Sequence, residues 1–275
     1  MKKLLLLLLF IPLVSFGQLT IETKYNPPEG FERIYNDGYS KFLRQFPLKK
    51  NNIVKFYDGY SDEEKPNYDS WDAVFDYDLG THKYHECADS VIYLYSKYNW
   101  VAKNYKNLEF HTKLGTSLKY NDYLNGVKYK GVKNKENNEW IDLKNDWNNP
   151  RPRLDNLRNF EAWLKIVWGW ANTYSIDEYN SIKINILDMR PGDFFVRSYP
   201  NSVGHAINVV DVVVNQTNNK KMYMLSQSFQ PAQETHILIN PQNGSVWYNL
   251  DEFNDIETPD YYPPFTVNEL KRFKS

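Results

Sequence analysis

The stretch that most restricts the fold of this chain is HAINVVDVVV, residues 205–214. It is almost continuously apolar and rich in β-branched residues, which is typical of a strand covered on both faces. Residues 215–220 (NQTNNK) have turn chemistry, and residues 221–229 (KMYMLSQSF) are typical of a return strand. Residues 158–174 carry apolar side chains at helical spacing. We therefore expect an α+β fold in which a mostly antiparallel sheet packs against helices.

The chain begins with the features of a secretory signal. Lys2 and Lys3 precede an apolar run over residues 4–14, which is too short to span a bilayer, and small residues follow it up to Gly17. We expect cleavage near Gly17, export to the periplasm or the medium, and one mature domain over residues 18–275. A retained membrane anchor is the alternative. No later segment is long and apolar enough to be expected to cross a membrane.

Charge and composition exclude one class of partner. The chain has 33 basic and 34 acidic residues and no basic stripe, so nucleic acid is not an expected partner. A mean hydropathy of −0.67 with 41% hydrophobic residues describes a globular chain with a polar surface.

Cys87 is the single cysteine, so the chain cannot form an internal disulfide. It lies where the helical pattern of residues 84–98 (YHECADSVIYLYSKY) begins. Unpaired N–H groups and the positive end of the helix dipole favour the thiolate, which is the nucleophilic form of cysteine. The alternative is an inert core residue, because Cys87 precedes the apolar Val91 by one helical turn.

A thiol nucleophile needs an imidazole to take its proton and return it to the leaving group. His205 is the candidate, since it opens the buried strand directly after Gly204, which permits a close approach of the backbone. Alternation along the strand places Asp211 on the face of His205, but six residues span roughly 20 Å, too far for contact. The return strand brings residues 227–230 opposite His205, and of these we expect the Gln227 amide to orient the imidazole. The alternative role of Gln227 is to satisfy buried backbone groups.

The chain resembles two groups of proteins. The segments ECADSVIYL, PGDFFV, GHAINVVD and LSQSFQPAQETHIL are similar to an uncharacterised exported bacterial family, domain of unknown function 4846. The order of a helix-borne cysteine, a PGD strand and a Gly-His strand also resembles the NlpC-type papain-like peptidases and amidases. That resemblance implies a papain-like arrangement with an N-terminal elaboration and insertions, and it assigns Cys87 and His205 as the catalytic pair. Glu86 stands where those enzymes usually have aspartate.

The leading hypothesis is an exported cysteine hydrolase that cleaves an amide bond, with cell-wall peptide as the substrate. Cys87 attacks the carbonyl, His205 acts as base and then acid, and Gln227 orients His205; no cofactor or metal is required. One alternative is a catalytically silent envelope protein that binds glycan or peptide in the same groove. Another is a zinc site formed by His82, His85 and Cys87 with His205 as fourth ligand.

Three tryptophans on the helix expected over residues 158–174 admit two interpretations. Trp168 belongs to its apolar stripe and Trp163 and Trp170 extend it, so core packing explains their spacing. The alternative is a platform on which sugar rings stack.

Overall fold

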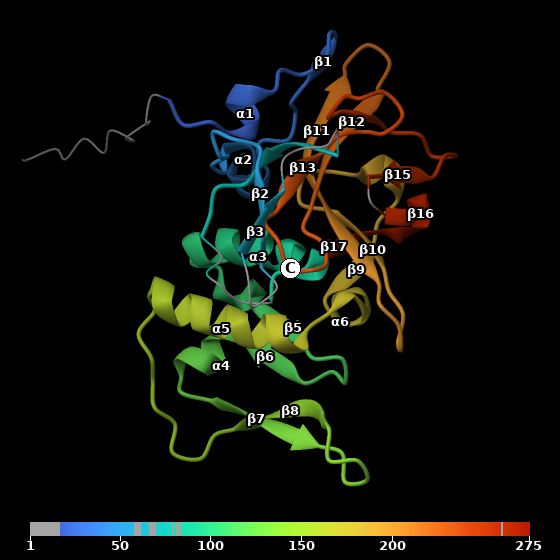
Figure 1. The fold of residues 1–275 in the computed structure, drawn as a ribbon. Helices are drawn as coiled ribbons and strands as arrows, with labels where there is room; N and C mark the ends of the chain where they lie inside the picture. The colour runs from blue at the N-terminus through green and yellow to red at the C-terminus, as the bar shows by residue number, and fades with distance from the viewer. Residues whose placement is uncertain (1–16, 58–61, 66–69, 79, 81–83, 260) are drawn as a thin grey trace, which may run out of the picture.

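An antiparallel sheet organised around β11 (His205–Asn215) forms the centre of the protein (Figure 1). The structure is a computed structural model that describes residues 17–57, 62–65, 70–78, 80, 84–259 and 261–275. In order across the sheet, the strands are β4 (Trp71–Val74), β13 (His236–Leu238), β12 (Lys221–Gln227), β11, β10 (Phe194–Arg197), β17 (Leu270–Phe273) and β9 (Ser181–Lys183). Two short strands, β1 (Phe31–Glu32) and β14 (Tyr248–Asn249), pair with β11 and β12. The pairings found among the described residues of this sheet are all antiparallel.

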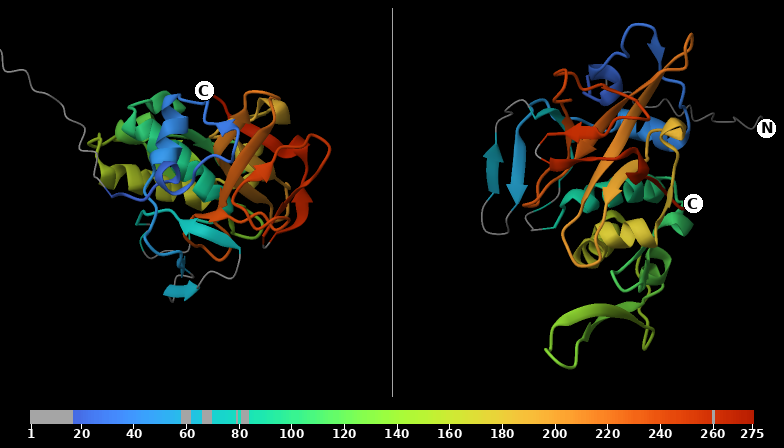
Figure 2. Two further views of the ribbon diagram at one scale, coloured as in Figure 1. Left: turned by 90° about the horizontal axis from the view of Figure 1, so that it is seen from above. Right: turned by 90° about the vertical axis from the view of Figure 1, so that its right-hand side faces the viewer.

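Helices cover one face of the sheet (Figures 1 and 2). They are α1 (Ile21–Lys24), α2 (Gly38–Gln45), α3 (Cys87–Val101), α4 (Tyr120–Leu124), α5 (Leu157–Trp170) and α6 (Thr173–Glu178). α3 lies directly on β11, where Asn208 Nδ2 donates to Ser90 Oγ at 3.3 Å. The apolar residues of α3 and α5 form one core with Ala206, Val210 and Val213 of β11.

The other face of the sheet carries a second, smaller core. Ile207, Val209 and Val212 of β11 pack there with the hairpin of β15 (Ile256–Thr258) and β16 (Tyr261–Phe265). Short 3-10 turns at Ile186–Asp188 and Val267–Glu269 complete this side. Because both faces of β11 are covered, its residues from His205 to Val214 are all buried, as their apolar sequence predicts. The predicted α+β architecture with an antiparallel sheet and packed helices is confirmed.

A β-bulge corrects one expectation for β11. The register of β11 against β12 shifts between Val209 and Asp211, so the alternation of side chains changes at that point. Asp211 therefore does not share the face of His205. It lies on the helix side, where Arg33 Nε donates to its Oδ2 at 2.7 Å and Arg44 Nη1 of α2 lies 3.8 Å from its Oδ1.

The PGD segment, residues 191–193, holds the C-terminal strand β17 in the sheet through Asp193. Asp193 is buried and accepts two hydrogen bonds from Arg272 of β17, at 2.6 and 2.9 Å. Its Oδ2 also accepts the N–H of Arg190, which closes the turn before β10. Gly192 has φ +94°, and a Cβ atom there would lie 2.5 Å from the ring of Tyr39. Close packing thus explains the glycine of this segment, and hydrogen bonding explains its aspartate.

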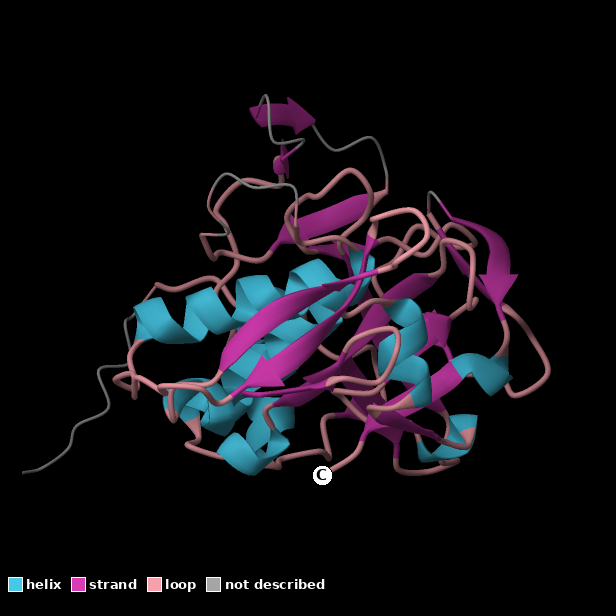
Figure 3. Ribbon diagram, turned by 90° about the horizontal axis from the view of Figure 1, so that it is seen from below, coloured by secondary structure: helices cyan, strands magenta, loops and turns pink. Residues whose placement is uncertain are grey.

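Besides β15–β16, three further hairpins of the described residues lie outside the central sheet. They are β2 (Val54–Tyr57) with β3 (Asp62–Lys65), β5 (Glu109–His111) with β6 (Ser117–Lys119), and β7 (Lys128–Lys133) with β8 (Trp140–Asp146). A 3-10 turn at Tyr105–Asn107 leads into β5. The hairpin β7–β8 extends from the helix side, at the bottom of Figure 1, and lies in front of the helices in Figure 3.

The described residues include no helix with the length and apolarity that a bilayer crossing requires. The expected signal segment lies outside the described residues apart from Gly17.

Candidate functional site

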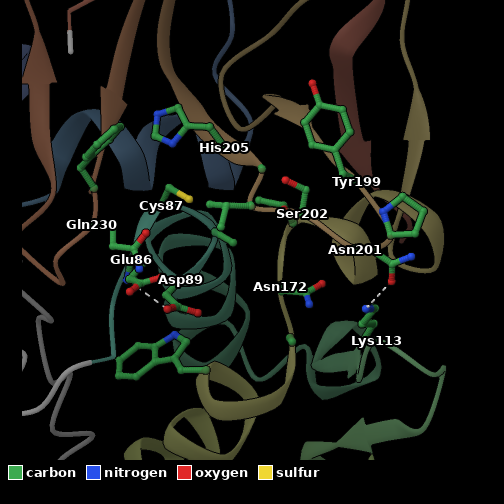
Figure 4. A pocket seen from close by; sticks show the side chains of 18 of the residues that line it. Glu86, Cys87, Asp89, Lys113, Asn172, Tyr199, Asn201, Ser202, His205 and Gln230 are labelled. Carbon is green, nitrogen blue, oxygen red and sulfur yellow. Dashed lines mark hydrogen bonds between the residues drawn. The ribbon is translucent and has the colours of Figure 1, made fainter. Parts of the chain in front are cut away.

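A pocket of about 630 Å³ lies where β11 begins, between the start of α3, the end of α5 and the loop before β11 (Figure 4). We call it the Cys87 pocket. Its lining residues are Glu86, Cys87, Ala88, Asp89, Lys113, Trp168, Ala171, Asn172, Thr173, Tyr199, Pro200, Asn201, Ser202, Val203, Gly204, His205, Phe229, Gln230 and Tyr261. Two of the predicted site residues, Cys87 and His205, are therefore brought to one cavity from positions more than one hundred residues apart.

Cys87 is the first residue of α3, as the sequence predicted. The helix begins there because Asp89 Oδ2 accepts the backbone N–H groups of His85 and Glu86, at 3.1 and 3.0 Å. The thiol is half-buried. Burial raises the pKa of Cys87 to about 12, and the backbone N–H groups of Ala206 and Ala88 act in the opposite direction. The expected easy ionisation at a helix N-terminus is therefore not found, because desolvation outweighs the N–H groups.

His205 is the first residue of β11 and is 2% exposed. Gly204 before it passes so close to Thr173 that a Cβ atom would lie 2.6 Å from Thr173 Oγ1 and would overlap the carbonyl oxygen of Arg197. The predicted close approach at Gly204 is confirmed. The imidazole packs against Phe229 and Tyr261.

The ring of His205 is held by Gln227. His205 Nε2 lies 2.8 Å from Gln227 Oε1. Because an amide oxygen only accepts, Nε2 carries the hydrogen and Nδ1 carries the lone pair. Burial lowers the pKa of His205 to about 4, and the hydrogen bond to Gln227 acts in the opposite direction. Gln227 Nε2 is buried without a hydrogen-bond partner among the described residues, so the contact with His205 is the one this side chain makes.

Cys87 and His205 line the same pocket but are not hydrogen-bonded to each other within the described structure. Both side chains line the cavity, and Figure 4 draws the imidazole above the thiol in this view. The sulfur also interacts with the N–H of Ala206, the residue after His205. The thiol and the imidazole are both neutral near pH 7, given the directions in which burial shifts their pKa values.

The chain matches the family described as a domain of unknown function (4846) over residues 21–272. It belongs to this family. No curated protein and no solved structure matches the chain. The family match supports the first of the two resemblances seen in the sequence.

The residues that the structure describes do not support the zinc hypothesis. His85 is buried and directs Nε2 to Tyr77 and Thr235, at 2.8 and 3.1 Å, and its ring packs on Trp168. Cys87 instead lines the pocket, and His82 lies outside the described residues. Among the described side chains, no group of three or more His, Cys, Asp or Glu is placed to hold a metal ion.

The tryptophans of α5 divide between core and surface. Trp163 and Trp168 are 0% and 8% exposed, so core packing explains both, although Trp168 also contributes to the pocket wall. Trp170 is half-buried at the end of the helix.

Sequence reasoning missed most of the pocket wall. Glu86 and Asp89 flank the thiol, and burial raises the pKa of Asp89 to about 8. The spacing of Asp89, three residues after the helix N-cap, was a visible capping signal. Lys113, Asn172 and Asn201 come from loops and helix ends that carry no motif, so only the folded chain shows that they meet.

Proposed function

We propose that this protein is a cysteine hydrolase that cleaves an amide bond in the Cys87 pocket. The observation that carries the proposal is the hydrogen bond of His205: its Nε2 is committed to Gln227, which leaves the lone pair on Nδ1. His205 and Cys87 line the same pocket. A cysteine hydrolase needs this relation of nucleophile, base and orienting group. The papain-like resemblance of the sequence supports the same assignment.

The first step joins the substrate to the enzyme. His205 Nδ1 accepts the thiol proton while Cys87 Sγ bonds to the carbonyl carbon of the substrate. A neutral imidazole is required, and a pKa near 4 keeps His205 neutral at pH 7. The negative charge that develops on the carbonyl oxygen is stabilised by the backbone N–H of Cys87, which has no acceptor within the first turn of α3.

The second step releases the products. The amide C–N bond breaks, and the leaving amine takes the proton from the His205 imidazolium, which leaves a thioester on Cys87. His205 then takes a proton from water as the water oxygen attacks the thioester carbon, and the carboxylic acid leaves as Cys87 regains its proton. Gln227 holds the same ring nitrogen throughout, so His205 does not rotate between the steps.

We propose cell-wall peptide as the substrate, encountered after export of the chain. The signal-like segment at residues 1–17 supports delivery outside the cytoplasm. The exposed pocket rim supports access by a peptide, because Tyr199 and Val203 are 45% and 77% exposed.

Alkylation of the single thiol tests the proposal. The native protein is treated with iodoacetamide at pH 7, and the mass increase on Cys87 is followed over time. A functional pair predicts alkylation of the folded protein that slows at least about ten-fold in His205→Ala, because the variant lacks the base. His111→Ala, which changes a half-buried histidine outside the Cys87 pocket, is the matched control and keeps the native rate.

Hydrolysis completes the test. Isolated cell-wall peptides are incubated with the wild type and with Cys87→Ser, and new amino groups are measured. Release by the wild type alone supports the proposal. Alkylation that begins only on unfolding, together with no release of amino groups, would contradict it.

Two observations favour a second candidate, a silent protein that binds peptide or glycan in the same pocket. The high pKa of Cys87 and the lack of a described hydrogen bond between Cys87 and His205 are as expected for an unreactive thiol. Binding of cell-wall fragments that is unchanged in Cys87→Ala, without hydrolysis by the wild type, distinguishes this candidate.

A further inference from the structure

The ionisable groups of the Cys87 pocket are divided between its two sides. Its carboxyl groups, Glu86 and Asp89, lie at the start of α3 beside Cys87. Its one lysine or arginine among the described lining residues, Lys113, lies at the other side of the cavity (Figure 4). A ligand that spans the pocket therefore meets a cation at the end away from the carboxyl groups.

Lys113 has unused hydrogen-bonding capacity. It follows β5 and crosses to the loop before β11, where Nζ donates to Asn201 Oδ1 at 3.3 Å. No carboxylate of the described residues lies within ion-pair distance of its ammonium group. An ammonium group has three N–H donors, so two remain for a ligand.

Two amide side chains line the pocket on the side of this cation. Asn201 uses its oxygen for Lys113, and Asn172 uses its oxygen to accept the N–H of Ser175 at the start of α6. Both amide nitrogens are thereby left as donors. Figure 4 shows Asn172, Asn201 and Lys113 together on this side of the pocket. Two amide N–H₂ groups and an ammonium group are suited to an anion with several acceptor oxygens.

The neighbouring arginine does not offer a second anion site. Arg197 lies opposite His205 on β10, but its guanidinium is bound to Glu269 at 2.6 and 2.7 Å and to the carbonyl oxygens of Pro263 and Pro264 at 2.7 Å. Four of its five N–H donors are thus used within the protein.

We propose that Lys113, with Asn172 and Asn201, binds the free C-terminal carboxylate of a peptide substrate. This inference rests on the proposed function and specifies its substrate class. A cavity of about 630 Å³ holds roughly two or three amino-acid residues. A carboxylate at Lys113 therefore directs Cys87 to an amide bond near the carboxyl end of the peptide, and the enzyme acts as a carboxypeptidase.

Binding to an inactive variant tests the carboxylate site apart from catalysis. Cys87→Ala is titrated calorimetrically with N-acetyl-trialanine and with the same peptide carrying a C-terminal amide. We expect the free acid to bind at least about ten-fold more tightly. In Cys87→Ala/Lys113→Met the two peptides bind equally, and in Cys87→Ala/Lys113→Arg the preference is largely kept because the charge remains. Cys87→Ala/Lys41→Met, which removes an exposed lysine of α2 away from the pocket, keeps the full preference.

The outcomes separate the two proposals. Equal affinity for acid and amide, a preference that survives Lys113→Met, or no binding of either peptide at 10 mM would overturn the carboxylate site. A preference for the acid with no hydrolysis of any peptide by the wild type would overturn the proposed function and leave the carboxylate site intact.

Discussion

His205 Nε2 donates to Gln227 Oε1 at 2.8 Å, across two neighbouring strands of the central sheet. Both residues are almost fully buried, so water does not compete for this hydrogen bond. The bond selects one tautomer and one orientation of the imidazole. It is the relation on which the proposed chemistry depends.

Gln227→Leu removes this acceptor while keeping the volume of the side chain. We expect the rate of Cys87 alkylation in the folded protein to fall at least about ten-fold, because the ring loses its tautomer and orientation. The pKa of His205, followed by NMR, should fall below its native value of about 4, since the hydrogen bond favours the protonated ring. Gln227→Glu keeps an acceptor and should raise that pKa. An unchanged pKa in both variants would show that Gln227 does not act on His205.

Acid should destabilise the protein through His205. Its pKa is about 4 when folded and near 6.5 in an unfolded chain, so between these values the unfolded state binds more protons. The stabilising contribution is complete above about pH 6.5 and is lost as pH falls to about 4. Urea unfolding of the wild type and His205→Gln should therefore differ in slope by up to about 1.4 kcal/mol per pH unit in this window. Equal slopes would refute the burial of a neutral His205.

Asp89 should change the pH dependence of the unfolding free energy in the direction opposite to that of His205. Burial raises its pKa to about 8, so between about pH 4 and 8 the folded state binds more protons and stability falls as pH rises. Asp89→Asn keeps an oxygen for the N–H groups of His85 and Glu86 but carries no charge. The free energy of unfolding of the variant, relative to the wild type, should therefore increase with pH, by up to about 1.4 kcal/mol per unit. A constant difference from pH 5 to 8 would contradict this prediction.

Gly204→Ala should distort the pocket. The added methyl group overlaps the carbonyl oxygen of Arg197 and crowds Thr173 Oγ1, so the backbone before His205 must move. We expect a loss of about 1 to 3 kcal/mol in unfolding free energy, as for overpacked sites, and a slower alkylation of Cys87. Gly244→Ala is a control at a glycine whose Cβ position is open, although its φ of +70° adds strain; its effect should be confined to stability. Native behaviour of Gly204→Ala would refute the close approach.

Asp193→Asn tests whether the PGD aspartate is structural. The variant weakens the two hydrogen bonds from Arg272 to a buried carboxylate, so we expect a loss of about 2 kcal/mol or more in urea unfolding. Lys119→Met, which removes an exposed contact with Glu109, should cost less than about 1 kcal/mol. Equal, small effects in both variants would show that the Asp193–Arg272 pair does not anchor β17.

Several features of the site could be predicted because they depend on short stretches of chain. The helix that starts at Cys87 follows from local spacing and capping. The contact between His205 and Gln227 follows from a hairpin whose turn lies between them. Asn208 pairs with Ser226, so Gln227 lies opposite Ile207, and it reaches His205 diagonally because Ile207 and His205 share a face of the strand. A β-bulge leaves no clear signal in the sequence. The predicted face of Asp211, which follows the bulge in β11, was therefore wrong.

The sequence by itself thus determined the buried hairpin of β11 and β12, the helix position of the lone thiol and the partner of His205, because periodicity and turn chemistry act over tens of residues. Only the tertiary structure decided that Cys87 and His205 share a pocket and that Lys113 and Asn201 complete it. It also decided the protonation of the thiol. A helix N-terminus favours the thiolate locally, but the amount of water excluded around Cys87 depends on everything packed against it.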